Sequence, residues 1–224
     1  MMDAADPSKF TQPGVSTRGE WTALLEDLLQ GIVHASNNRF TALMSLAQLA
    51  ELDGGSTDDG TMMRQELARL HEVVSWVGAL IAPPAQAEAL ELHAVLNVAL
   101  AMHALHPRMR SIGCTLEREG DIPPVRTRRA ALLRLLLLLV DAATRAGDAS
   151  HEKAVVVRLS ADGDTVRLAV FARAPVSPDA AALAPSCGCT LEAREGQWVL
   201  ELPSLAALRR SERVETTRSP GADA

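Results

Sequence analysis

A histidine stands in a short run of amide and hydroxyl side chains, His34-Ala35-Ser36-Asn37-Asn38-Arg39-Phe40-Thr41. Apolar residues on both sides of the run recur at three- and four-residue steps, which predicts an amphipathic helix. At about 100° per residue, His34 lies in the middle of a polar face whose other members are Asp27, Gln30, Asn38, Thr41, Ser45 and Gln48. Leu25, Ile32 and Leu43 lie on the opposite face. We therefore expect an exposed imidazole on a rigid helix, a nucleophile that another protein can reach.

This helix is the first of two that we expect to form a hairpin. It runs from Gly19 to about Leu52, and Asp53-Gly54-Gly55-Ser56 breaks it. The second helix ends at Pro83-Pro84 and repeats apolar residues in steps of three and four: Met63, Leu67, Leu70, Val74, Val77 and Ile81. A lone hairpin leaves apolar surface uncovered, so we expect two copies to pair into a dimeric four-helix bundle, a homodimer.

The second half of the chain alternates helices with strands. Helices are expected over Glu91–His106 and Arg128–Arg145, and strands over residues 114–119, 154–159, 166–171, 189–193 and 198–202. Helices packed on a sheet place the chain in the α+β class. The expected divisions are a flexible tail over 1–18, the helical hairpin domain over 19–84, an α/β sandwich domain over 85–204 and a C-terminal tail over 205–224.

Composition narrows the function classes. Residues 19–84 carry nine acidic and three basic side chains, whereas binding nucleic acid requires an excess of basic ones, so no nucleic-acid partner is expected. The first 20 residues lack the apolar run of a signal peptide, and the longest apolar run, Leu135–Val140, is too short to cross a bilayer. We expect a cytoplasmic chain without membrane insertion. Cys187-Gly188-Cys189 resembles half of a metal clip but lacks a second ligand pair, so no metal site is expected.

Other histidines and arginines carry weaker signals. His71 is the other candidate nucleophile in the hairpin, but no motif surrounds it. His103 and His106 have a spacing found in metal sites, yet without carboxylates nearby in the sequence we expect them on the surface. The cations of the long helix, Arg128, Arg129 and Arg134, are expected on its solvated face.

The first half resembles the dimerisation and phosphoacceptor domain of bacterial sensor histidine kinases. Their phosphoacceptor box often has the order His-Asp-x-Asn-Asn-x-x-Thr, which His34, Asn37, Asn38 and Thr41 match and Ala35 does not. The second half resembles the kinase ATP-binding domain in the order and spacing of Leu92–Leu105, Ile122-Pro123-Pro124-Val125 and Leu132–Ala142. The resemblance covers roughly residues 20–203 and implies a histidine kinase-like fold with a degenerate ATP-binding domain.

The departures from the kinase pattern bear on ATP. Asp141-Ala142 stands where the kinases have the Asn-Ala that holds magnesium, and Leu137 stands at the other usual Asn. Ala172-Arg173-Ala174-Pro175 stands where an Asp-x-Gly-x-Gly box reads the nucleotide, and about fifteen residues before the next strand leave too little chain for a lid and its helix. Phosphate cradles need glycines because backbone N–H groups must approach closely. We therefore expect no ATP binding and no cofactor, with Mg²⁺ supplied by a partner.

Together these features resemble the ChpT-type histidine phosphotransferases, in which a dimeric bundle presents a histidine to response-regulator receiver domains. The resemblance implies that His34 accepts a phosphoryl group from one receiver aspartate and passes it to another, an enzyme closer to a phosphotransferase than to an ATP-dependent kinase. Asn38 would position the phosphate or a water, and Gln30, Asn37, Arg39 and Thr41 would contact the partner. Three alternatives remain: a non-catalytic adaptor or pseudokinase that binds response regulators or a sensor kinase, a receiver phosphatase using Asn38, and a residual ATP-dependent kinase.

Overall fold

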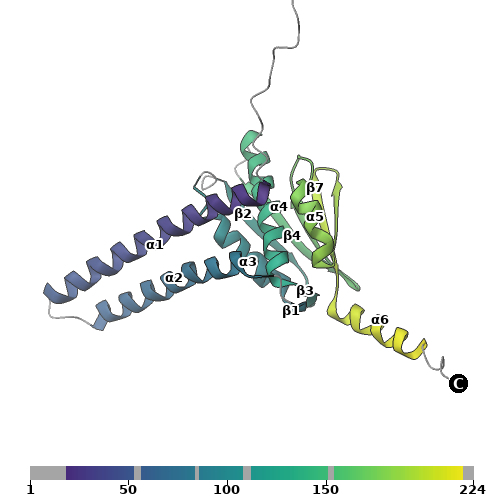
Figure 1. The fold of residues 1–224 in the computed structure, drawn as a ribbon, viewed down its shortest axis with the longest axis horizontal. Coiled ribbons are helices and arrows are strands. Elements are labelled where there is room, and N and C mark those ends of the chain that lie inside the picture. Colours follow the sequence, from purple (N-terminus) through teal and green to yellow (C-terminus); the bar gives the residue numbers. More distant parts are fainter. Residues whose placement is uncertain (1–18, 53–56, 84–85, 108–111, 151–153, 219–224) are drawn as a thin grey trace, which may run out of the picture.

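The fold is α+β: a long helical hairpin precedes a sandwich of helices on one five-stranded sheet (Figure 1). The computed structural model describes residues 19–52, 57–83, 86–107, 112–150 and 154–218. The flexible tail expected over residues 1–18 and the expected helix break at residues 53–56 lie outside these ranges. No helix among the described residues combines the length and apolar character needed to span a membrane.

The hairpin consists of α1 (Glu20–Leu52) and α2 (Thr57–Ile81), which run side by side and project away from the sandwich (Figure 1). Only the base of α1 is anchored in the core, through Leu24, Leu28 and Ile32. The base of α2 joins the same core through Val73 and Leu80. Burial of these apolar side chains fixes the lower end of the hairpin on the sandwich, while the upper turns stand in solvent.

The sheet has the order β2-β4-β5-β7-β6. Its strands are β2 (Gly113–Glu119), β4 (Ala154–Asp162), β5 (Thr165–Phe171), β6 (Thr190–Arg194) and β7 (Gln197–Pro203). Strands β2 and β4 are parallel, because the crossover between them contains α4 (Arg129–Ala149), and the other neighbours are antiparallel. Glycine turns after Asp162 and Glu195 join the antiparallel neighbours, with Gly163 and Gly196 at positive φ.

The core lies between the sheet and two helices, α3 (Leu92–His103) and α4. Thirteen residues of α4 are buried, including the run Leu135–Val140, so this helix is apolar on nearly every side. Trp198 of β7 is the largest fully buried side chain, and its indole Nε1 donates to the Ala174 carbonyl at 2.8 Å. With only 3% aromatic residues in the chain, aliphatic packing supplies most of this core.

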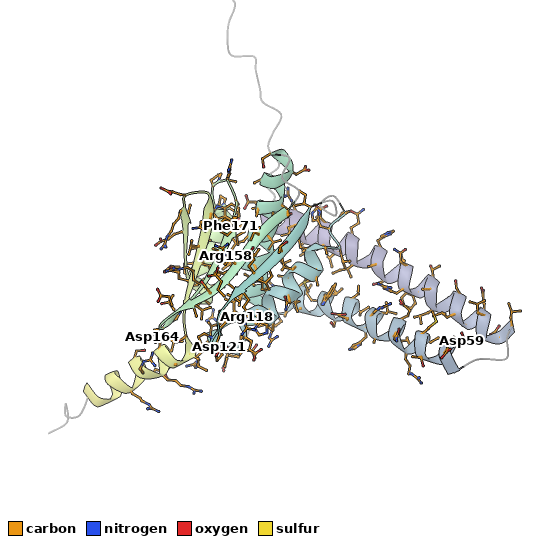
Figure 2. All side chains as sticks on the ribbon, turned by 180° about the vertical axis from the view of Figure 1, so that it is seen from behind. Asp59, Arg118, Asp121, Arg158, Asp164 and Phe171 are labelled. Carbon is orange, nitrogen blue, oxygen red and sulfur yellow. The ribbon has the colours of Figure 1, made fainter. Side chains whose placement is uncertain are left out.

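Charged pairs link neighbouring strands of the sheet. Figure 2 labels Arg158 and Phe171, which lie on adjacent strands of it. Arg158 of β4 contacts Glu117 of β2 at 2.9 Å, and its guanidinium lies 5.2 Å from the Phe171 ring of β5. Farther across, Arg167 of β5 meets Glu201 of β7 at 3.0 Å. Alternate residues of each strand point to the same face of the sheet, so charge alternates with buried apolar side chains.

Several elements differ from the sequence-based expectation. A two-stranded sheet joins β1 (Glu88–Leu90) to β3 (Val125–Thr127), and neither strand was predicted, because three-residue strands carry too short an alternation to detect. The segment before β6 is helical, with α5 (Pro178–Leu183) and the 3₁₀ helix η2 (Ala184–Cys187), so the expectation that no helix fits there was wrong. Within the segment expected as a C-terminal tail, the chain forms α6 (Leu205–Arg218), whose first turn is capped by Ser204 Oγ.

Arg134 is not on a solvated face, contrary to the prediction. It donates to the carbonyls of Leu80 and Ala82 at 3.4 and 3.2 Å, and its guanidinium lies 5.4 Å from the Trp21 ring. A cation at the carbonyl end of α2 complements the helix dipole there. Arg134 thus ties α4 to the bases of both hairpin helices, a contact between distant segments that the periodicity of α4 alone does not reveal.

Candidate functional site

His34 lies near the middle of α1, exposed to solvent, just above the anchored base of the hairpin. The side-chain amide of Asn38, one turn later, lies 3.3 Å from His34 Nε2. When Nε2 carries no proton, the Asn38 NH₂ group can donate to it, and this leaves the proton on Nδ1. The pair therefore presents an oriented imidazole whose Nε2 faces a hydrogen-bond donor and open solvent.

The other predicted residues of the polar face are also exposed. Gln30, Asn37 and Thr41 all lie in solvent. Thr41 Oγ1 donates to the Asn37 carbonyl at 3.0 Å, and Ser45 Oγ donates to the Thr41 carbonyl at 3.0 Å. These bonds hold the hydroxyls against the helix backbone, while the Asn37 and Gln30 amides stay accessible to a partner.

Arg39 is held within the hairpin. Its guanidinium contacts Glu66 of α2 at 2.9 Å, and Glu66 also meets Arg69. The hydrogen bond from Arg69, together with the nearby Arg39, holds the pKa of the Glu66 carboxyl below its usual value. Arg39 thus joins α1 to α2 beside His34, and a role in partner binding stays a prediction.

The position that the resemblance to kinases relates to a nucleotide lies on α4, at Asp141 and Ala142, beside a small cavity. The face of α4 bearing Leu138, Asp141 and Ala142 is covered by Glu20 and Ala23 of α1 and by Ser177, which leaves a cavity of about 210 Å³. Ser177 Oγ donates to the Glu20 carboxylate, and the Trp21 amide donates to Asp179 at 2.9 Å. These contacts fasten the first turn of α1 to α5 across the face of α4.

The Ala172-Arg173-Ala174-Pro175 segment borders a different, open hollow of about 480 Å³, which residues 193–198 complete. Its backbone is already engaged: the Ala172 amide donates to the Gly196 carbonyl at 3.0 Å, and the Ala174 carbonyl accepts from Trp198. A phosphate cradle needs several free N–H groups converging on one point. The Ala172 amide, which already donates to Gly196, is not available for such a cradle.

A buried polar cluster connects α1, the end of α3 and α4; it comprises Asp27, His103, His106 and Asp141. The Nε2 atom of His106 lies 3.3 Å from Asp27 Oδ2 and 3.8 Å from Asp141 Oδ1, and His103 Nε2 lies 3.7 Å from the same Asp141 oxygen. The two imidazole rings are stacked, with centroids 5.6 Å apart. Arg145 lies on the solvent side of the cluster and donates to Asp141 Oδ2 at 2.7 Å.

The burial of this cluster corrects two sequence-based predictions. Asp27 was placed on the water-facing polar stripe, but it is only 9% exposed, and His103 and His106 are 2% and 0% exposed rather than on the surface. The sequence of α1 contained a signal of this burial. Asp27 lies within an apolar repeat formed by Leu24, Leu28, Gly31 and Ile32. A polar residue at a core position of such a repeat indicates a buried partner.

Charge and burial oppose each other within the cluster. Burial lowers the pKa of His106, although Asp141 and Asp27 partly offset the effect by favouring its protonated form. Burial works to raise the pKa of Asp141, but the adjacent His103 ring and Arg145 hold it below its usual value. Near neutral pH, Asp141 is therefore ionised and His106 is neutral.

Other candidate groups are placed as follows. His71 is exposed on α2. Cys187 and Cys189 are both buried around Gly188, which has positive φ, and Cys189 Sγ donates to the Ala184 carbonyl at 3.1 Å. Within the described ranges, no three or more His, Cys, Asp or Glu side chains are placed to hold a metal ion.

Exposed apolar side chains are concentrated on the hairpin. In the part of the chain that the structure describes, every large apolar residue that is at least half exposed lies on α1 or α2: Val33, Phe40, Met44, Leu49, Leu52, Met62, Leu67, Val74 and Ile81. Along α1, Val33, Phe40 and Met44 fall within about 40° of one another and about 100° from His34. Along α2, Leu67, Val74 and Ile81 form a second stripe of the same width.

No protein-family model and no curated protein matches the sequence. Solved structures match its fold. The catalytic domain of the histidine kinase ThkA is 14% identical over 54% of this chain and 98% of its own, with a TM-score of 0.42. Histidine kinase AdeS from Acinetobacter baumannii is 15% identical over 75% and 96%, with a TM-score of 0.43. A structure described as a bacterial phosphotransferase is 16% identical over 84% and 98%, with a TM-score of 0.37.

The chain combines a helical hairpin with a five-stranded sheet that carries helices on one face. At these identities and TM-scores, the similarity to the solved structures decides nothing about the chemistry of this chain. The function is argued below from this chain's own side chains.

Proposed function

We propose that this protein is a histidine phosphotransferase of a two-component phosphorelay, with His34 as the phosphoacceptor and response-regulator receiver domains as partners. The observation that carries the proposal is the exposed His34 ring with the Asn38 amide 3.3 Å from its Nε2. An oriented, solvent-facing imidazole on a helix that projects from the rest of the chain is accessible to a second protein's active site.

The reaction balances without a nucleotide. Once the Asn38 amide releases Nε2, the Nε2 lone pair of His34 attacks the phosphorus of a receiver's aspartyl phosphate. A P–N bond forms, and the P–O bond to the aspartate breaks, which leaves a free carboxylate. The imidazole proton on Nδ1 remains in place, and the reverse reaction phosphorylates a second receiver. Phosphoryl transfer depends mainly on positioning and charge neutralisation. The receiver's Mg²⁺ would supply the neutralisation, so this chain needs no cofactor of its own.

Asn38 can act on His34 both before and after the phosphoryl transfer. Before transfer, its amide orients Nε2, and after transfer the same NH₂ group can donate to a phosphoryl oxygen one turn along the helix. The exposed Gln30, Asn37 and Thr41 border His34 along the helix and supply polar contacts to the receiver. Arg39 would add a cation at the edge of the interface, shared with Glu66.

Two further features support transfer without ATP. Asp141 contacts His103, His106 and Arg145, and the cavity that it borders is small, about 210 Å³, because Glu20 and Ala23 at the start of α1 line it too. Ala35 follows His34 where an acid would assist the attack on ATP. An aspartyl phosphate is already a high-energy donor, so it makes smaller demands on the acceptor site.

We also propose a homodimer, with the hairpin domain (19–84) providing the contact and the sandwich (85–204) lying outside it. The α1 stripe (Val33, Phe40, Met44) and the α2 stripe (Leu67, Val74, Ile81) lie beside the surfaces through which α1 and α2 pack on each other. Contiguous exposed apolar stripes of this kind mark interaction surfaces. Two hairpins paired through them would form a four-helix bundle and leave His34 on the outside, about 100° from the α1 stripe.

The Asn38 contact also favours a second candidate function, a receiver phosphatase. A side-chain amide beside the histidine could orient a water for attack on the receiver's aspartyl phosphate. In that case His34 would carry no label, and receiver phosphate would be lost to solution.

A phosphotransfer assay tests these functions against each other. Receiver domains that carry a ³²P-labelled aspartyl phosphate are mixed with the protein, with and without Asn38→Ala. We expect label on this protein, still measurable in Asn38→Ala, with an altered rate of loss to water. Free phosphate without label on the protein, abolished by Asn38→Ala, would establish the phosphatase instead. Binding of receivers without either event would establish a non-catalytic adaptor.

A further inference from the structure

The helix face that presents His34 is the face that the sandwich covers two turns earlier. Asp27 and His34 are seven residues apart, so they point in nearly the same direction, about 20° from each other. Asp27 is buried against the end of α3, whereas His34 is exposed. The covering surface of the sandwich therefore ends between them, about 10 Å of helix or less below His34.

Gly31 marks the upper edge of that covering surface. A Cβ atom built at Gly31 would lie 2.1 Å from the Leu105 carbonyl oxygen, so the backbones of α1 and the segment after α3 touch here. Gly31 precedes His34 by three residues, about 4.5 Å along the helix. Leu105 of the sandwich therefore lies within about one helical turn of His34 along α1.

The contact between α1 and the sandwich contains titratable groups from three elements. Asp27 comes from α1, His103 and His106 from the end of α3, and Asp141 with Arg145 from α4. All but Arg145 are buried. The buried Thr144 hydroxyl lies 3.3 Å from His103 Nε2, and Leu24, Leu28 and Ile32 of α1 pack beside the cluster in the common core. A change of charge here therefore acts directly on the attachment of α1.

We propose that Asp27, His106 and Asp141 form a proton-sensitive clamp that holds α1 on the sandwich, and that Asp27 and His106 thereby act as positioning residues for His34. The effect on transfer rests on the proposed phosphoacceptor function. The clamp itself rests only on the geometry of the cluster.

The direction of the proton effect follows from burial. Burial lowers the pKa of His106 while α1 is docked, and a solvent-exposed imidazole titrates near 6.5. Undocking α1 therefore takes up a proton once the pH falls below about 6.5, and the docked state loses stability from there down to the lowered pKa. One proton increases the opening equilibrium by at most about tenfold per pH unit. Asp141, whose pKa lies below its usual acidic value, contributes only at lower pH.

Hydrogen exchange tests the clamp without any phosphate chemistry. Protection factors of the amides at residues 24–32 are compared at pH 7.5 and 5.5 in the full-length protein, His106→Gln and His71→Gln. In His106→Gln the new side-chain amide can occupy the position of Nε2 without titrating, and His71 is exposed on α2 and outside the cluster. We expect protection in the parent and in His71→Gln to fall by up to about tenfold per unit below pH 6.5, and to stay level in His106→Gln.

NMR of the parent protein keeps the proposal testable if His106→Gln does not fold. The imidazole C2–H of His106 should titrate with a midpoint below 6.5, and Asp27→Asn should lower the midpoint further because it removes a carboxylate that favours protonation. A midpoint at or above the ordinary value, or acid loss of protection that persists in His106→Gln, would overturn the clamp.

Transfer kinetics test the positioning role separately. The initial rate of label uptake is measured for His106→Gln and for the parent at both pH values. Any titration of His34 or of the receiver is common to the two proteins and cancels in the ratio. We expect the ratio of His106→Gln to parent to rise at pH 5.5. If label is transferred but the ratio of rates is the same at both pH values, the positioning role is overturned and the proposed phosphotransferase function stands. If hydrogen exchange depends on pH as expected but no label is transferred, the proposed function is overturned and the clamp stands.

Discussion

Replacing Gly31 by alanine tests how closely the phosphoacceptor helix is fitted to the sandwich. In an open helix this change stabilises by about 1 kcal/mol, because alanine loses less backbone entropy. At Gly31 the new methyl group would lie 2.1 Å from the Leu105 carbonyl oxygen, whereas ordinary contact begins near 3.4 Å. The two backbones must therefore separate by about 1.3 Å, and overpacking of this kind costs about 1–3 kcal/mol.

Gly78→Ala is the matched control. Gly78 also lies inside a long hairpin helix, α2, but a Cβ built there has no atom within 4 Å. The helix-propensity gain is common to both variants, so their difference in unfolding free energy measures the clash alone, about 1–3 kcal/mol. For a chain of this size, that corresponds to a Tm roughly 2–12 °C lower for Gly31→Ala than for Gly78→Ala.

The assay is thermal denaturation of the parent and both variants under one buffer condition, followed by circular dichroism. We expect Gly78→Ala at or above the parent and Gly31→Ala below it. Equal Tm values for the two variants would refute the close backbone contact, and with it the conclusion that the sandwich reaches to within one turn of His34.

Three further predictions concern the surface, the nucleotide region and a thiol. Leu67→Glu should convert a dimer of the 23.9 kDa chain to a monomer in light scattering, whereas Gln65→Glu on the opposite face of α2 should not; a parent that is already monomeric at micromolar concentration would contradict this. Calorimetry with MgATP should give no binding heat, and a micromolar dissociation constant would contradict the account of Asp141 and of the covered face of α4. Burial raises the pKa of Cys114 to about 11, so its alkylation by iodoacetamide at pH 8 should be about a hundredfold slower than in the unfolded chain, and an equal rate would show an open thiol.

The sequence predicted the regular elements well because their patterns are long. Thirty-three residues of α1 and twenty-one of α4 provide many turns of periodicity, and the two β-hairpins are marked by glycine turns. The exposure of His34 followed from the same periodicity. Its contact with Asn38 is local, one turn apart, so spacing alone brought the two together.

The buried cluster could not be predicted in the same way. Asp27, His106 and Asp141 are far apart in the sequence and meet only because the base of α1 docks against the segment after α3 and the middle of α4. Angular position on an isolated helix placed Asp27 with His34, and the direction was right. The predicted exposure of Asp27 was wrong because the burial of a residue depends on what packs against its turn of the helix. Periodicity along one helix does not specify that neighbour. Strands β1 and β3 were missed for a related reason, since each is stabilised by the other and not by its own residues.

The central claim is tested most directly by locating the label. The parent, His34→Gln and His71→Gln are incubated with a receiver carrying labelled aspartyl phosphate, and protein-bound label is tested for the acid lability and base stability of phosphohistidine. His34 is exposed and makes no core contacts, so His34→Gln should change stability by only about 0.5 kcal/mol. We predict acid-labile, base-stable label on the parent and on His71→Gln, and none on His34→Gln. Undiminished label of this kind on His34→Gln would contradict the assignment of His34 as the phosphoacceptor.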